Sequence, residues 1–179
     1  MKIYRCRICG ETYLGSERPS HCPFCGAHAE LIVDTTEYPE DINVVQITEI
    51  ERNDLLEAIQ LERGNARFYF GMGQHKADNP LLASTYKRLA KVEAEHCELF
   101  CKLAGVPEPE DLTEPEDVSA DWCANIEDSL AREQRASRFY AQASTRATND
   151  RVREVFAAVS EVEADHIELD HLARNIAGC

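Results

Sequence analysis

A glutamate and a histidine three residues apart occur twice in this chain of 179 residues, as Glu93 with His96 and Glu163 with His166. On a helix, residues at this spacing lie on nearly the same face, so both side chains can reach one metal ion. A single pair is a weak indication, but each pair here also has a glutamate well upstream that can join it. The candidate ligands of this site are Glu62, Glu93, His96, Glu133, Glu163 and His166.

The charge of these candidate ligands also suits a metal site. Four buried carboxylates without compensation are strongly destabilising, whereas two divalent cations balance them and leave both histidines neutral. Iron and manganese accept mixed oxygen and imidazole ligands. One Glu from each of two helices and a Glu-x-x-His from each of two others is the general pattern of di-iron carboxylate bundles. The competing interpretation is that these residues belong to solvated, glutamate-rich helix faces.

Four helices are predicted to position these residues, over about 48–78, 80–104, 120–148 and 149–176. The two helical hairpins repeat each other, since Arg-Phe-Tyr at 67–69 recurs at 138–140 and Val-Glu-Ala-Glu-His at 92–96 recurs, with one Asp for Glu, at 162–166. In an antiparallel hairpin, two residues share a height only if the turn lies midway between them. The turn signals at 79–80 and 148–150 lie midway between the paired glutamates, so the four carboxylates are expected to meet inside the bundle.

Several side chains near these motifs have weaker assignments. Tyr69 and Tyr140 lie two helical turns beyond a candidate glutamate, and because helical side chains point toward the N-terminus, each phenol could hydrogen-bond a ligand carboxylate. The alternative is that both are core aromatic residues. The remaining acids of the motif helices and the remaining histidines are expected to be exposed or ordinary surface residues: Glu95, Glu98, Asp165, Glu168, His21, His28, His75 and His171.

Four cysteines near the N-terminus form the pattern C-x2-C-x12-C-x2-C. Two such pairs can place four thiolates around one tetrahedral ion, and the glycine after each pair permits the tight turn. The ligands are Cys6, Cys9, Cys22 and Cys25. Zinc and iron both suit four sulfurs; a structural zinc ribbon is the commoner case, but a redox-capable metal bundle in the same chain favours iron.

Composition limits the class of protein. The net charge of -14 argues against nucleic-acid and anionic-membrane binding, and no apolar run is long enough to span a bilayer. The N-terminus lacks the apolar stretch of a signal peptide, so we expect a cytoplasmic protein whose eight cysteines are metal ligands or free thiols before disulfides. Cys97 and Cys101 are expected to be buried apolar residues and not a redox pair.

The predicted fold is therefore mainly α, with two parts. Residues 1–33 form a small four-cysteine metal domain, and 34–47, which include an acidic stretch with a proline, form a linker. Residues 48–179 form a four-helix bundle in which the proline-rich stretch after Gly105 crosses between the two hairpins.

The arrangement of the four cysteines and the six carboxylate and histidine ligands resembles the rubrerythrins. The N-terminal position of the rubredoxin-like cysteine domain is similar to that of reverse rubrerythrins, and the bundle to ferritin-like proteins. This resemblance implies a non-haem di-iron peroxidase that reduces hydrogen peroxide to water. It also implies a homodimer in which the cysteine domain of one subunit lies against the di-iron site of another. One position departs from the family, because Ala136 stands where the family usually has an extra glutamate one turn after Glu133; the mirrored position on the first helix is Asn65.

Three functions remain open at this stage. The leading hypothesis is peroxide reduction by the di-iron pair, with electrons relayed through the four-cysteine iron from an external reductase. The missing extra glutamate favours the second, a ferroxidase that uses dioxygen as oxidant. The third is a non-catalytic metal-binding protein with a zinc ribbon. A homodimer or a higher homo-oligomer is expected in the first case.

Overall fold

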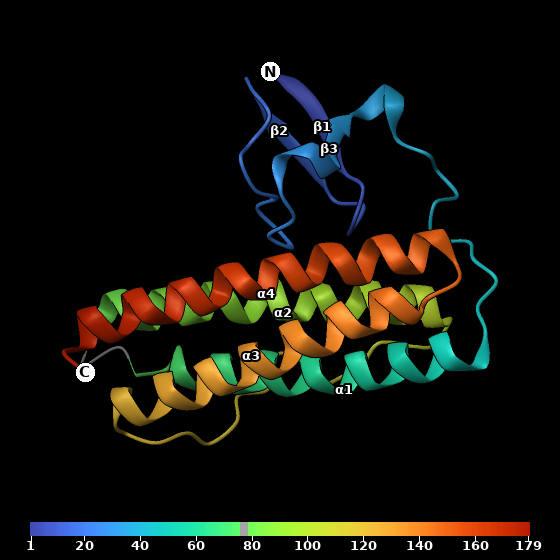
Figure 1. The fold of residues 1–179 in the computed structure, drawn as a ribbon. Helices are drawn as coiled ribbons and strands as arrows, with labels where there is room; N and C mark the ends of the chain where they lie inside the picture. The colour runs from blue at the N-terminus through green and yellow to red at the C-terminus, as the bar shows by residue number, and fades with distance from the viewer. Residues whose placement is uncertain (76–78) are drawn as a thin grey trace.

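The N-terminal part of the chain is a small three-stranded antiparallel sheet. In the computed structural model, which describes residues 1–75 and 79–179, the strand order is β2-β1-β3. Short 3-10 turns stand before and after the third strand, at Ala29–Leu31 and Thr35–Glu37. The strands are β1 (Lys2–Cys6), β2 (Thr12–Gly15) and β3 (Ile32–Asp34). The turns that carry the cysteines lie at the end of the sheet nearest the helices (Figure 1).

The rest of the chain is a four-helix bundle of two antiparallel hairpins. The first hairpin consists of α1 (Glu49–Met72) and α2 (Pro80–Ala104), and the second of α3 (Trp122–Arg146) and α4 (Asp150–Ala177). The segment between α2 and α3 runs back along the bundle, so that α3 starts at the end opposite to the one where α2 finishes (Figure 1). The predicted fold class, a mainly α four-helix bundle with a long crossover and a small four-cysteine domain, is confirmed.

The crossing segment is fastened to α1 by charge pairs. Asp111 accepts hydrogen bonds from Arg63 Nε at 2.7 Å and from Arg67. The Glu116 amide donates to the Arg67 carbonyl at 3.0 Å. Gly71 permits this close approach, because a Cβ there would lie 2.2 Å from the Glu116 carbonyl oxygen. A glycine in α1 thus marks where the crossover packs against the helix.

Local sequence sets the ends of the helices. A capping box begins α1, since the Thr48 hydroxyl accepts from the Glu51 amide and the Glu51 carboxylate accepts from the Thr48 amide at 2.7 Å. The prediction for the first helix differs at its other end, because α1 stops at Met72 and not at 78. Gly71 and Gly73 lower helix propensity there, and residues 76–78 of the prediction lie outside the described residues.

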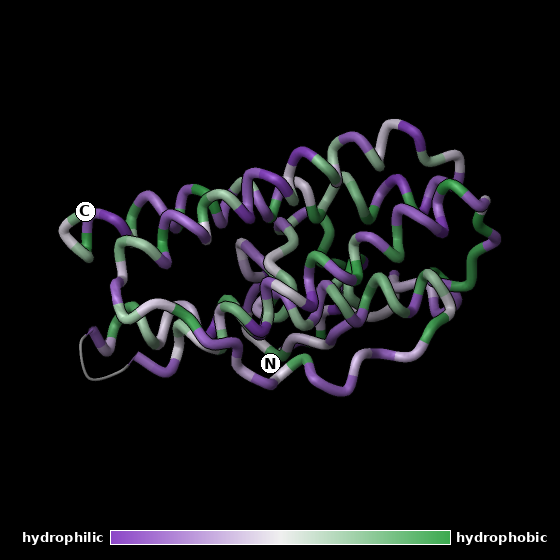
Figure 2. The backbone as a smooth tube through the Cα atoms, turned by 90° about the horizontal axis from the view of Figure 1, so that it is seen from below, coloured by the Kyte–Doolittle hydropathy of each residue, from purple (hydrophilic) through white to green (hydrophobic). Residues whose placement is uncertain are grey.

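The bundle core consists of two apolar clusters separated by a polar layer. One surrounds Tyr140, Phe100 and Phe156 and continues into the four-cysteine domain, and the other surrounds Tyr69 and Tyr86. Hydrophilic and hydrophobic residues alternate along each helix (Figure 2), as amphipathic helices require. None of the described helices is apolar over a length that could cross a membrane.

One expectation about the cysteines is wrong. Cys123 and Cys179 form a disulfide across a sequence separation of 56 residues, although all eight cysteines were expected to be ligands or free thiols. The first turn of α3 and the residue after α4 meet at one end of the bundle, and this brings the two sulfurs together. Cys97 and Cys101 are buried free thiols, as expected.

Candidate dinuclear metal centre and four-cysteine site

The six predicted ligands from the four helices meet in the polar layer of the bundle. All four carboxylates and His96 have no solvent exposure, and His166 is 7% exposed. Their ligand atoms form two groups, each with all its members within 4.8 Å of one another. The first group contains Glu62, Glu93, His96 and Glu163; the second contains Glu93, Glu133, Glu163 and His166.

Glu93 and Glu163 are shared by the two groups. Glu93 Oε2 lies 3.6 Å from His96 Nδ1, and its Oε1 lies 3.1 Å from His166 Nδ1. Glu163 does the same, with Oε1 3.3 Å from His96 Nδ1 and Oε2 3.1 Å from His166 Nδ1. The arrangement therefore has two bridging carboxylates, while Glu62 and Glu133 each serve one side only. The sequence pattern did not distinguish these two roles.

The donor atoms of this cluster fit a pair of divalent cations. Glu62 Oε2, both oxygens of Glu93, Glu133 Oε2, Glu163 Oε1 and His96 Nδ1 are buried and have no hydrogen-bond partner among the described residues. Buried polar atoms in proteins are nearly always paired, and buried carboxylates need a compensating charge. Oxygen and imidazole donors in this number suit iron or manganese, so the residues present fit the implied di-iron centre.

The pKa values of the cluster residues reflect the same lack of a compensating charge for the buried carboxylates. Burial, followed by repulsion from Glu93 and Glu163, raises the pKa of Glu62 far above its usual range. Burial opposes charge on His96, but the nearby carboxylates of Glu163 and Glu93 raise its pKa to about 10. Protons and metal ions therefore compete for the same atoms, and metal affinity must fall as the pH falls.

Both tyrosines contact a non-bridging carboxylate, in each case on the other hairpin. Tyr140 Oη donates to Glu62 Oε1 at 2.5 Å, and Tyr69 Oη donates to Glu133 Oε1. Burial raises the pKa of both phenols, so each stays a protonated donor. Such a hydrogen bond orients a ligand carboxylate. The helical spacing predicted that each phenol could contact a ligand carboxylate, but only the packing of the helices decides which carboxylate it is.

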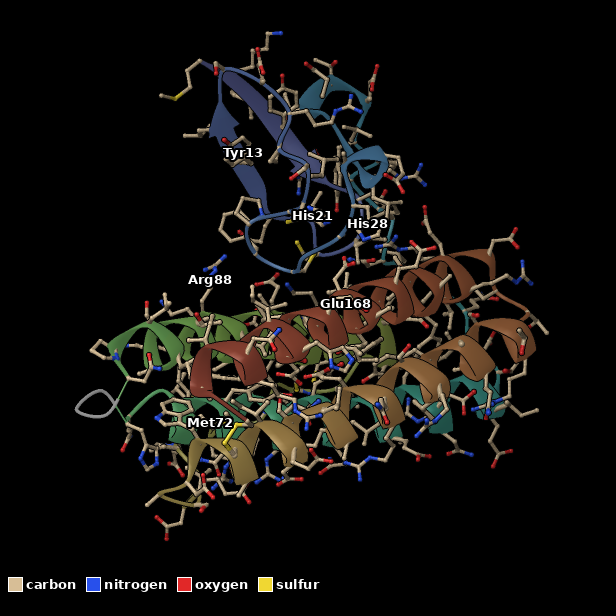
Figure 3. The ribbon with its side chains drawn as sticks, turned by 60° about the vertical axis from the view of Figure 1, so that its left-hand side comes forward. Tyr13, His21, His28, Met72, Arg88 and Glu168 are labelled. Atoms are coloured by element: carbon tan, nitrogen blue, oxygen red, sulfur yellow. A yellow bond between two sulfur atoms is a disulfide. The ribbon has the colours of Figure 1, made fainter. Side chains whose placement is uncertain are left out.

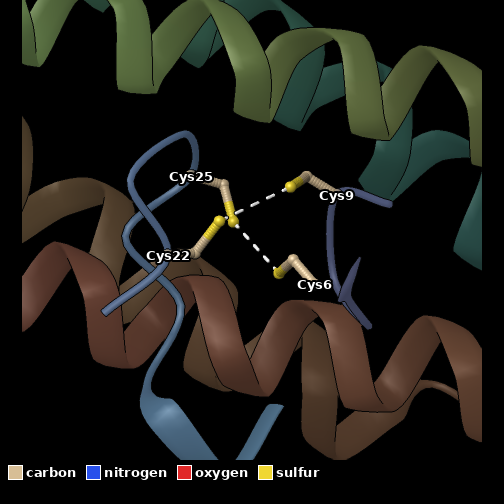
Figure 4. Close-up of side chains that lie close together, drawn as sticks. All are labelled: Cys6, Cys9, Cys22 and Cys25. Carbon is tan, nitrogen blue, oxygen red and sulfur yellow. Dashed lines mark hydrogen bonds between the residues drawn. The ribbon is translucent and has the colours of Figure 1, made fainter. Parts of the chain in front are cut away.

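The four predicted cysteine ligands converge in the N-terminal domain (Figure 4). Cys6 Sγ lies 3.7 Å from Cys25 Sγ, and Cys9 Sγ lies 3.8 Å from Cys22 Sγ. A tetrahedral ion with metal–sulfur bonds of about 2.3 Å requires sulfurs about 3.8 Å apart. All four are buried, so the geometry fits one tetrahedral metal ion.

The four-cysteine domain lies directly over the dinuclear cluster of its own chain. His96 Nε2 donates a hydrogen bond to the Cys25 carbonyl oxygen at 2.8 Å. Because a carbonyl can only accept, Nε2 carries the proton and Nδ1 is left to face the carboxylates. Gly26, with φ +77°, lies so close to α4 that an added Cβ would be 2.7 Å from Val162 Cγ1. The two candidate metal sites are thus connected through one cysteine carbonyl and one imidazole.

The two histidines of the cluster have different surroundings. Whereas His96 is covered by the cysteine domain, His166 lines a cavity of about 390 Å³ between α2 and α4. This cavity is lined by Ser84, Thr85, Arg88, Leu89, Val92, His166 and Leu169. Only the His166 side of the cluster has such an opening among the described cavities.

Other predictions near the motifs are partly wrong. Glu95 and Glu98 are half-buried and not exposed, and burial raises the pKa of Glu95 to about 7, because the cysteine domain and neighbouring acids surround this part of α2. Asp165, Glu168 and His171 are exposed, as expected.

The histidines outside the ligand set are not all ordinary surface residues. His28 is half-buried between the two domains, where its Nε2 lies 2.7 Å from Asp165 Oδ2. His21 and His28 both lie on the side of the cysteine domain that faces the bundle (Figure 3). His75 is half-buried and packs edge-on to Trp122.

The structure also contains a buried polar group that the sequence did not indicate. Asp170 has no solvent exposure and contacts Ser129 Oγ and Tyr86 Oη, each at 2.7 Å. Ser129 in turn lies 3.1 Å from Tyr69 Oη. An aspartate one turn after His166 on a helix rich in acids looks like a solvated residue, so no local signal could have found this network.

The fold and these two sites define a four-helix bundle that carries a carboxylate-bridged dinuclear site beside a four-cysteine site. Comparison with known proteins agrees: residues 4–31 match the family described as rubrerythrin, rubredoxin-like domain. The chain is 31% identical over 115 residues to reverse rubrerythrin-1 of Clostridium acetobutylicum, a match that covers 59% of this chain and 63% of the relative. No solved structure matches significantly. These two likenesses confirm the resemblance to rubrerythrins, and in particular to a reverse rubrerythrin.

Proposed function

We propose that this protein is a non-haem di-iron peroxidase that reduces hydrogen peroxide to water, with electrons relayed through an iron in the four-cysteine site. The observation that carries the proposal is the hydrogen bond from His96 to the Cys25 carbonyl. It connects a buried carboxylate–histidine cluster to a one-electron site within one chain. The likeness to a reverse rubrerythrin over part of both chains supports the same conclusion.

The residues of the cluster would hold two iron ions. Glu93 and Glu163, which belong to both groups of ligand atoms, would serve both ions; Glu62 and His96 would help to hold one ion, and Glu133 and His166 the other. A reduced di-iron pair supplies the two electrons that the reduction of one peroxide to two waters requires. The phenols of Tyr140 and Tyr69 hold Glu62 and Glu133 in orientation through their hydrogen bonds.

The four-cysteine site would act as the electron relay. Zinc has no redox chemistry. A purely structural ion would not require a hydrogen bond between one of its cysteine residues and a ligand of the second site. The close contact of the cysteine domain with His96 therefore favours iron at Cys6, Cys9, Cys22 and Cys25. An external reductase as electron donor, a homodimer or higher homo-oligomer, and a cytoplasmic location belong to the same proposal.

The cavity at His166 gives a small substrate a way toward the cluster. It reaches the one histidine of the site that the cysteine domain leaves uncovered. Leu89, Val92 and Leu169 give this cavity apolar walls, which admit a small neutral molecule such as hydrogen peroxide more readily than an ion. We therefore infer that substrate enters between α2 and α4.

A ferroxidase that uses dioxygen is the second candidate. Ala136 is buried at the position where the family has an extra glutamate, and its counterpart on α1 is the buried Asn65. The site then has six ligands and no additional carboxylate from these positions. The attached electron-relay site argues against this function, because ferrous iron as substrate would supply its own electrons.

Rapid mixing of the fully reduced protein with peroxide or with dioxygen tests the proposal. We expect peroxide to oxidise the dinuclear site much faster than dioxygen does. A Cys9→Ser variant, which lacks the relay, should still be oxidised in one turnover but should fail to be re-reduced through the four-cysteine site. Oxidation by peroxide no faster than by dioxygen would refute the peroxidase. Zinc at the cysteines by metal analysis, without the visible spectrum of iron, would instead favour the non-catalytic protein.

A further inference from the structure

A chain of hydrogen bonds leaves the dinuclear cluster on the Glu133 side and ends in the interior of the bundle. Tyr69 Oη contacts Glu133, and Ser129 Oγ lies 3.1 Å from Tyr69 Oη. Asp170 Oδ2 lies 2.7 Å from Ser129 Oγ, and Asp170 Oδ1 accepts from Tyr86 Oη at 2.7 Å. These residues come from all four helices, and none of them has solvent exposure.

Among the residues that the structure describes, the other half of the repeat has no such chain. In the register of the duplicated hairpins, Ser129 corresponds to Ala58, Asp170 to Phe100 and Tyr86 to Phe156. Tyr140 donates to Glu62, but its ring packs against Phe100 and Phe156 at centroid distances of 5.4 and 5.9 Å. The polar chain is therefore confined to one half of an otherwise repeated site.

Burying a carboxyl group costs free energy, which hydrogen bonds offset only in part. Burial raises the pKa of Asp170 to about 6, although the hydrogen bonds from Ser129 and Tyr86 oppose this shift. The titratable groups around it are Tyr86 from α2, Tyr69 from α1 by way of Ser129, and His166 and His171 of its own helix. Apolar residues fill the equivalent space in the other half, so packing alone does not require an aspartate here.

We propose that Asp170 is a buried proton donor that supplies the dinuclear site through Ser129 and Tyr69. This inference rests on the proposed function, because the reduction of one hydrogen peroxide to two waters consumes two protons with its two electrons. The relay delivers one proton at a time to the Glu133 carboxylate, beside the place where the substrate oxygens are reduced.

The directions of the hydrogen bonds depend on the protonation of Asp170. Ser129 has one hydroxyl proton, which can go either to Asp170 or to Tyr69. When Asp170 is protonated it donates to Ser129, Ser129 donates to Tyr69, and Tyr69 donates to Glu133. All the donors then point toward the metal ligands. When Asp170 is ionised, Ser129 donates to Asp170 and the chain toward Glu133 is interrupted.

The transfer conserves every proton. The Asp170 carboxyl O–H bond breaks as a bond forms to Ser129 Oγ, the Ser129 proton passes to Tyr69 Oη, and the Tyr69 proton passes to Glu133 Oε1. Asp170 is left as a carboxylate, Ser129 and Tyr69 keep one proton each, and Glu133 has gained one. The electrons come from the reduced metal pair of the proposed function, and one proton must return to Asp170 before the next turnover.

The test compares Asp170→Asn with wild-type holoprotein in single-turnover oxidation by peroxide. Asn keeps the size and hydrogen-bonding capacity of the side chain but has no acidic proton to give. The matched control is Glu168→Gln, which removes a carboxylate from the exposed face of the same helix. We expect Asp170→Asn to be at least about tenfold slower, as general acid catalysis predicts, with an altered solvent deuterium isotope effect. Glu168→Gln should match the wild type.

Two further measurements separate a proton relay from a structural role. The metal content and melting temperature of Asp170→Asn should equal those of the wild type. The infrared spectrum of the wild type should show a protonated-carboxyl band below a pH of about 6 that Asp170→Asn lacks. Ser129→Ala, which keeps Asp170, should slow the reaction likewise and provides the test if Asp170→Asn loses metal.

Wild-type rates and isotope effects in Asp170→Asn and Ser129→Ala would overturn the relay. Failure of the proposed function would give a different result. The wild-type protein would then be oxidised by peroxide no faster than by dioxygen, and no variant is needed to see this. In that case the same variants are compared with dioxygen as oxidant, since its reduction also consumes protons.

Discussion

At the scale of single residues, the two histidines of the cluster differ in what lies behind them. His96 Nε2 is held by the Cys25 carbonyl, which leaves Nδ1 toward Glu62, Glu93 and Glu163. His166 presents Nδ1 to the other side of the cluster and lines the cavity between α2 and α4. The repeat gives both sides the same types of ligand, but the His96 side faces the cysteine domain and the His166 side faces the cavity.

The bridging role of Glu163 predicts the result of its removal. Because each of its oxygens faces a different histidine, Glu163→Ala should lose both ions of the pair while keeping the cysteine-bound ion. Glu168→Ala, on the exposed side of the same helix, is the control and should keep all of them. Metal analysis of the purified variants measures this. A Glu163→Ala protein with its complete metal content would contradict the ligand set.

At the scale of the helices, the N-terminus of α1 is connected to the turn between α3 and α4 through one carboxylate. Glu51 accepts from the amides of Thr148 and Asn149, each at 2.7 Å, as well as from Thr48 in the capping box. Burial would raise the pKa of Glu51, but these hydrogen bonds lower it to about 2. The same residue therefore begins one hairpin and attaches it to the other.

Glu51→Gln should lower the free energy of unfolding by about 2 kcal/mol, because hydrogen bonds to a charged acceptor are replaced by weaker ones. Since the folded-state pKa is lowered, the contribution of Glu51 is present above its ordinary pKa of about 4.5 and is lost as the pH falls toward about 2. Urea unfolding at neutral pH and near pH 2 measures it. Glu49→Gln, exposed in the same first turn, is the control. A difference between variant and wild type that does not shrink in acid would disprove the assignment.

At the scale of the whole molecule, the four-cysteine domain is held on α4 by a buried arginine. Arg151 donates to the Ile8 carbonyl at 2.8 Å and to Asn43 Oδ1 at 2.9 and 3.0 Å, and it pairs with Glu154. His28 contacts Asp165 further along the same helix. These contacts bring Cys25 to the position where its carbonyl meets His96.

Arg151→Ala should therefore loosen the domain while leaving the bundle folded. We expect limited proteolysis to cut the segment between the domains faster than in the wild type, because the buried Ile8 carbonyl and the half-buried Asn43 and Glu154 side chains lose their donor, at a cost of about 1–3 kcal/mol. Under the proposed function, electron transfer from the four-cysteine site should slow as well. Arg153→Ala, exposed in the same helical turn, is the control. Equal cleavage rates in both variants would show that Arg151 does not hold the domain.

The sequence by itself determined the features that depend on local spacing. The capping box at Thr48, the duplicated hairpin and the two Cys-x-x-Cys turns follow from residues near one another in the chain. Helical periodicity and the turn positions also predicted which six ligands lie at one height. A helix has a fixed rise and rotation per residue, so neighbours within it can be placed without tertiary information.

Only the tertiary structure decided how the faces of separate elements meet. Glu93 and Glu163 became the bridging residues, Asp170 found Ser129 and Tyr86, and Cys123 reached Cys179 because of the way the helices pack around one another. The burial of Glu95 and the contact of His28 with Asp165 likewise depend on where the cysteine domain lies. These contacts join residues that are distant in sequence, and their geometry depends on side-chain packing between elements, which no local pattern records.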